Sequence, residues 1–99
     1  MSSTAFVELE KKYPEIVRMM PDEFNSHFFI LTLAQRYQRL YVQALNEYVK
    51  NDQPFQSVHK EIAKRLKNHK DLVKYLYTRS SKNIFGHENG AAVWKKVKK

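Results

Sequence analysis

Basic side chains in the second half of the chain are the residues whose type and spacing could contact a partner. From residue 51 onward the sequence holds twelve lysines and arginines against four acidic residues, whereas the first fifty residues are balanced in charge. The net charge of +8 therefore arises entirely from the second half. Because a surface with this excess attracts polyanions over long range, we predict that the second half carries the binding surface.

No arrangement of residues indicates catalysis or a bound metal. The four histidines are His27, His59, His69 and His87, and no two of them are four residues apart, as the ligand pairs of helical zinc sites are. The chain has no cysteine. Its serines and carboxylates form no nucleophile and base pair, and it has no glycine-rich phosphate loop. We therefore expect neither an enzyme nor a cofactor or metal site.

The composition predicts one small, mainly helical domain over residues 1–99. Hydrophobic residues make up 42% of the chain, which has only two glycines and three prolines. The absence of cysteine fits a reducing compartment. No apolar run approaches the roughly 20 residues that span a bilayer, and no export signal is visible. We expect a cytoplasmic protein, associated with the nucleoid if it binds DNA.

Hydrophobic periodicity divides this domain into four segments. Residues 1–24 form an N-terminal helical segment, in which Pro14 predicts a break. Residues 25–50 contain neither glycine nor proline and predict one long central helix. Its apolar stripe recurs every three or four residues: Phe29, Leu33, Tyr37, Leu40, Ala44 and Tyr48. Residues 54–79 predict two shorter helices, and residues 80–99 a basic tail or wing.

Two structures are compatible with the tail. Ile84 to Phe85 and Ala92 to Trp94 could form two short strands of a hairpin, with the pair Asn89–Gly90 at its turn. Alternatively, Asn89 could cap a short helix that presents Val93, Trp94 and Val97 at helical spacing. The pattern is too short to decide between a short C-terminal β-hairpin and a helix.

Ala63, Val73 and Leu76 have the spacing of buried positions in two packed helices. Ala63 is a small residue that allows close approach, and Val73 and Leu76 follow it by ten and thirteen residues. In this respect the segment from about residue 58 to 79 resembles a helix-turn-helix, as in winged-helix-like DNA-binding domains. The fold that we predict is therefore mainly α, with a long central helix and a helix-turn-helix-like basic half.

The resemblance implies that a helix from His69 to Arg79 enters the major groove of DNA. The nucleic-acid-binding residues would then be Lys60, Lys64, Lys67, His69, Lys70, Lys74, Thr78, Arg79 and Lys82. The expected function is that of a small basic regulator or accessory factor that contacts duplex DNA. Two alternatives stay open, a module that docks an acidic protein and an RNA-binding protein.

Two further interpretations concern apolar side chains. Helix-turn-helix proteins often bind as dimers, and the apolar residues between Phe6 and Met20 could form a homodimer interface or cover the chain's own core. Aromatic side chains can also stack on unpaired bases. Tyr75 and Tyr77 flank Leu76 in the basic half, and we expect one of these two tyrosines to be exposed.

Overall fold

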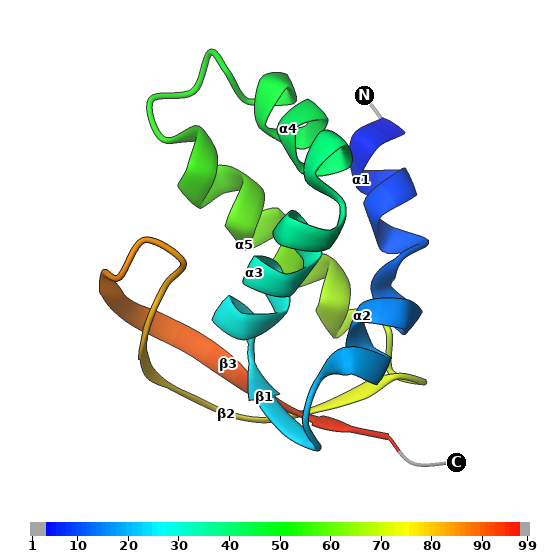
Figure 1. The fold of residues 1–99 in the computed structure, drawn as a ribbon. Coiled ribbons are helices and arrows are strands. Elements are labelled where there is room, and N and C mark those ends of the chain that lie inside the picture. The colour runs from blue at the N-terminus through cyan, green and yellow to red at the C-terminus, as the bar shows by residue number, and fades with distance from the viewer. Residues whose placement is uncertain (1–3, 98–99) are drawn as a thin grey trace.

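An antiparallel sheet packs against a group of helices in the computed structural model, which describes residues 4–97 (Figure 1). The helices are α1 (Thr4–Glu10), α2 (Tyr13–Met19), α3 (Ser26–Arg36), α4 (Gln38–Glu47) and α5 (Pro54–Lys67). The strands are β1 (Glu23–Asn25), β2 (Val73–Lys82) and β3 (Glu88–Lys96), and their order across the sheet is β1-β3-β2. Lys98 and Lys99 of the predicted tail lie outside the described residues.

The prediction of a mainly α, all-helical fold is wrong, because residues 73–82 form a strand. The second helix of the predicted helix-turn-helix, from His69 to Arg79, does not exist, since β2 pairs with β3 along its length. Val73, Tyr75, Tyr77 and Thr78 are β-branched or aromatic residues, which favour strands. Leu76 has no partner on β3, so it forms a bulge. Because of this bulge, the sequence does not show the regular two-residue alternation of a strand.

The single long central helix is also wrong, because the chain breaks at Tyr37. Tyr37 has φ −125° and ψ 60°, outside the helical region, and separates α3 from α4. Its hydroxyl donates to the Glu15 carboxylate, and the ammonium of Lys12 lies 5.2 Å from the centre of its ring. These contacts with the N-terminal segment favour a break in a stretch that contains neither glycine nor proline.

The predicted break near Pro14 is confirmed. The chain is interrupted before Pro14, between the end of α1 and the start of α2. Of the two alternatives for the tail, the structure has the hairpin. However, the hairpin is longer than predicted and turns at residues 83–87, so that Asn89 and Gly90 lie within β3.

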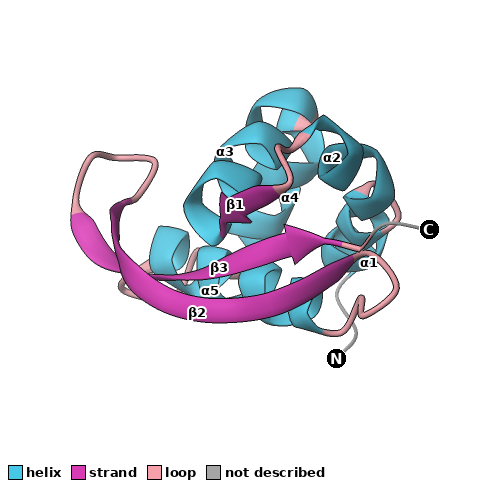
Figure 2. Cartoon of the chain, turned by 90° about the horizontal axis from the view of Figure 1, so that it is seen from below, coloured by secondary structure: helices cyan, strands magenta, loops and turns pink. Residues whose placement is uncertain are grey.

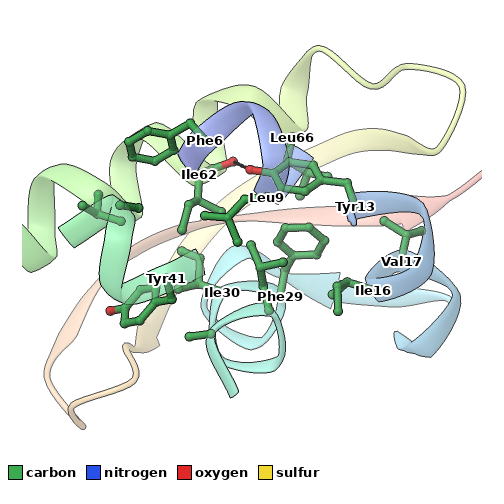
Figure 3. Close-up of a cluster of buried hydrophobic side chains, with 14 of the residues drawn as sticks. Phe6, Leu9, Tyr13, Ile16, Val17, Phe29, Ile30, Tyr41, Ile62 and Leu66 are labelled. Atoms are coloured by element: carbon green, nitrogen blue, oxygen red, sulfur yellow. Dashed lines mark hydrogen bonds between the residues drawn. The ribbon is translucent and has the colours of Figure 1, made fainter. Parts of the chain in front are cut away.

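The hydrophobic core lies between the helices and against the sheet, and a buried hydrogen bond joins two of its residues (Figure 3). The buried Tyr13 hydroxyl donates to the Ile62 carbonyl at 2.8 Å, which ties α2 to α5. The Tyr13 ring meets Phe29 edge-on, with ring centres 4.9 Å apart. Burial raises the pKa of Tyr13, so its hydroxyl stays protonated and can donate. Most of the apolar residues that a dimer interface would use are buried in this core, namely Phe6, Leu9, Tyr13, Ile16, Val17 and Met20, whereas Val7 and Met19 are exposed.

Trp94 of the central strand joins the sheet to the helices. It lies opposite Phe24 of β1 and Tyr75 of β2, and its indole N–H donates to the Ser26 hydroxyl at 2.9 Å. Trp94 and Ser26 are both buried, so this bond is shielded from water. Figure 2 shows the strands lying across one side of the helices, and Figure 1 shows the β2–β3 hairpin turning toward α5.

Replacing Leu33 with Ala should destabilise the protein by about 2–5 kcal/mol, because Leu33 is fully buried in α3. Val42→Ala on α4 is the control, since Val42 is 59% exposed and its loss leaves no cavity. Urea denaturation followed by circular dichroism measures both free energies of unfolding. Equal, small losses from the two variants would contradict this packing.

Candidate functional site

A groove lies between α5 and the β2–β3 hairpin, with the start of α3 at its base. Its volume is about 1150 Å³. We call it the α5–hairpin groove. Its lining includes three lysines (Lys60, Lys64 and Lys67), two histidines (His27 and His59) and one carboxylate, Asp52. An anionic partner is therefore favoured over a cationic one.

Helix α5 supplies the basic wall of the α5–hairpin groove. Pro54 stands in its first turn, where the missing amide hydrogen costs no hydrogen bond. One face buries Val58, Ile62 and Leu66 in the core. The other face lines the groove with a stripe at helical spacing: Gln56, Lys60, Ala63, Lys64 and Lys67. The core contacts on one face thus orient the lysines on the other.

The hairpin supplies the aromatic wall. Tyr75 lies opposite Trp94 in the sheet, and the two rings meet edge-on with centres 5.8 Å apart. The Tyr75 hydroxyl forms a hydrogen bond of 2.8 Å with the Thr78 hydroxyl. Thr78 in turn pairs with Ala92, which also lines the groove. Tyr75 is therefore held in place on both sides while half of its surface stays exposed.

The tip of the hairpin is a tight turn organised by Asn83. The Asn83 side-chain oxygen accepts hydrogen bonds from the backbone amides of Phe85 and His87, at 2.9 and 3.1 Å. Gly86 has a φ of +82°, a conformation that residues with a Cβ rarely adopt. The turn therefore fixes the direction in which Phe85 points.

Phe85 closes one end of the α5–hairpin groove by contacting the first turns of α5. Its ring centre lies 4.8 Å from that of Phe55, edge-on, and 6.0 Å from that of His59, in a stacked arrangement. Phe85 and Phe55 nevertheless remain 50% and 45% exposed. The groove thus ends in aromatic surface that is open to a ligand.

His59 is neutral at physiological pH. Burial, with a smaller effect from nearby His27, lowers the pKa of His59 to about 4. Its Nε2 atom shares a hydrogen bond of 2.7 Å with the Tyr41 hydroxyl. Burial raises the pKa of Tyr41 to about 12, so that this hydroxyl also stays neutral. His59 therefore adds no positive charge to that of the groove's lysines.

The structure separates the predicted site residues into groups. Lys60, Lys64 and Lys67 come together in the α5–hairpin groove. Lys74 pairs with Lys95 one position before Tyr75, so alternation along the strand places it on the other face of the sheet. Four predicted residues are exposed but do not line the groove. They are Lys70 in the turn after α5, and Thr78, Arg79 and Lys82 on β2.

His69 belongs to a different cluster. Its Nε2 atom lies 2.8 Å from a carboxylate oxygen of Glu10, whose other oxygen accepts from Arg65 at 2.6 Å. Burial raises the pKa of Glu10, but the hydrogen bonds from His69 and Arg65 outweigh this effect and leave it lowered. The cluster joins α1 to α5, so His69 contributes to the fold.

Sequence reasoning missed several groove residues. Gln56 precedes Lys60 by four residues, so the helical stripe alone could have identified it. Phe85 was assigned to a strand, because nothing local indicates that the hairpin tip meets Phe55 of α5. Their encounter depends on a turn that lies about thirty residues from Phe55 in sequence.

Within residues 4–97, no group of three metal-ligating side chains is found. In the same part of the chain, no helix has the length and apolar character to cross a membrane. Comparisons with protein-family models, curated proteins and solved structures gave no match. The groove's own chemistry must therefore carry any assignment of function.

Acidification should destabilise the protein through His59. Because the folded state lowers the pKa of His59 from 6.5 to about 4, the unfolded state binds a proton more readily across that interval. The free energy of unfolding that comes from keeping His59 neutral is fully present above pH 6.5 and is lost as the pH falls toward 4. Urea denaturation at several pH values should show a shallower decline for His59→Gln than for the wild type. Identical declines would show that His59 is not held neutral.

Proposed function

We propose that this protein binds duplex DNA as a winged-helix-like domain, acting as a regulator or an accessory factor. The observation that carries the proposal is the row of three lysines on the groove face of α5, beside a hairpin that stands next to the same helix. In this proposal α5 takes the role of the groove-binding helix, which the resemblance had implied for residues 69–79. The β2–β3 hairpin takes the role of the wing.

Dimensions support this docking. A helix of fourteen residues is about 21 Å long, and a helix with its side chains is roughly as wide as the major groove. In duplex DNA one sugar–phosphate strand separates a major groove from the adjacent minor groove. With α5 at the major groove and the hairpin tip at the minor groove, that strand would run along the α5–hairpin groove.

The lysines have distinct roles in this arrangement. Lys60, Lys64 and Lys67 would neutralise phosphates, which positions the protein but reads no sequence. Gln56 and Ala63 lie on the same stripe, and these residue types recognise adenine and the thymine methyl group. Residues of the β2–β3 hairpin line the same groove as Gln56 and Ala63, which supports a wing beside the recognition helix.

Replacing both Lys60 and Lys64 with Ala should weaken binding to a duplex and reduce its dependence on salt. Each lost phosphate contact lowers the slope of log K against log salt by about 0.9, so the pair should lower it by nearly two units. Fluorescence anisotropy with a labelled duplex at several salt concentrations measures both effects. The matched control is Lys11→Ala with Arg18→Ala, which removes the same charge from exposed positions outside the groove.

Other results would redirect the proposal. Equal losses from the two pairs would indicate diffuse attraction by net charge alone. No binding to a duplex at low salt would reject DNA as the partner. Tighter binding of an RNA duplex or of an acidic protein would support the corresponding alternative function.

A further inference from the structure

We propose that the α5–hairpin groove accepts an unpaired nucleotide of the bound DNA, with its base on the aromatic wall and its phosphate on the lysines. This inference rests on the proposed function and adds the kind of DNA that the site prefers. It would direct the protein to duplexes that contain a bulged or unpaired base.

The first observation is a set of half-exposed aromatic rings around one groove. Phe55, Tyr75 and Phe85 line it and are 45%, 50% and 50% exposed. A fully paired duplex presents phosphates and base edges, while the faces of its bases are stacked on one another. An unpaired base offers a free face, and stacking of that face on an aromatic ring is a main source of affinity for single strands.

The second observation is the charge opposite these rings. Lys60 and Lys64 lie one helical turn apart on the wall that faces the hairpin. A nucleotide has the matching chemistry, a flat base joined to an anionic phosphate. Asp52 is the acidic residue of the lining, so the net charge of the groove favours a phosphate.

The third observation is the size and firmness of the groove. Its 1150 Å³ slightly exceeds the roughly 300–1,000 Å³ of small-molecule pockets, so a base with its sugar and phosphate fits. Ala63 lies between the lysines, and its small side chain leaves space in the groove. The Asn83 turn fixes Phe85, and the Trp94 and Thr78 contacts fix Tyr75, so the rings need little ordering when a base binds.

The experiment compares two duplexes that differ by one nucleotide. One is fully paired, and the other carries a single unpaired 2-aminopurine. The wild-type protein should bind the second duplex about tenfold more tightly, the lower part of the range for stacking of one base. Binding should also quench the 2-aminopurine fluorescence, because this base loses emission when it stacks.

Phe85→Ala and Tyr75→Ala should bring the affinity ratio of the two duplexes close to one and remove the quenching. Tyr77→Ala is the matched control, since Tyr77 is on the same strand, is 45% exposed and does not line the groove. It should keep both the ratio and the quenching. Phe85 stands in the hairpin turn, so its variant keeps the test valid if Tyr75→Ala fails to fold.

The outcomes separate this inference from the proposed function. Equal wild-type affinity for the two duplexes, or a preference that survives in Phe85→Ala, would overturn the unpaired-base site and leave duplex binding intact. A lack of binding to both duplexes at low salt would overturn the two proposals together.

Discussion

The structure depends most on the buried contact between Trp94 and Ser26. Trp94 is in the central strand and lies opposite Phe24 and Tyr75, so one side chain sets the position of both neighbouring strands. Its indole N–H donates a hydrogen bond to the Ser26 hydroxyl at the start of α3. Leaving either group without a partner in the interior would lower the free energy of unfolding. Since α3 packs on α5 and β3 carries the hairpin, this bond fixes the distance between the two walls of the groove.

The groove combines charge and aromatic surface because two separate constraints meet there. The core requires Val58, Ile62 and Leu66 on one face of α5, which turns the lysines toward the hairpin. The bulge at Leu76 increases the local twist of the strand, and the Asn83 turn then points Phe85 back at Phe55. Neither constraint concerns binding, yet together they produce a concave basic and aromatic site.

Local sequence patterns predicted only part of this arrangement. The stripe of Lys60, Lys64 and Lys67 was evident because the helical period of α5 is regular, and the break near Pro14 follows from proline's missing donor. Residues 73–79 of β2 were mistaken for part of a helix, because Leu72, Val73 and Leu76 fit a helical period while the unpaired Leu76 breaks the alternation of a strand. The break at Tyr37 and the contact of Phe85 with Phe55 both depend on partners distant in sequence, which a local pattern cannot show.

Mapping by nuclear magnetic resonance tests most directly whether the α5–hairpin groove is the DNA-binding surface. A titration of the ¹⁵N-labelled protein with a short duplex would follow every backbone amide. If DNA binds in the groove, the largest shifts should fall on residues 56–67 of α5 and on residues 83–92 of the hairpin, while α1 and α4 change little. Shifts concentrated on α1 and α4, with the groove unaffected, would contradict binding in the groove.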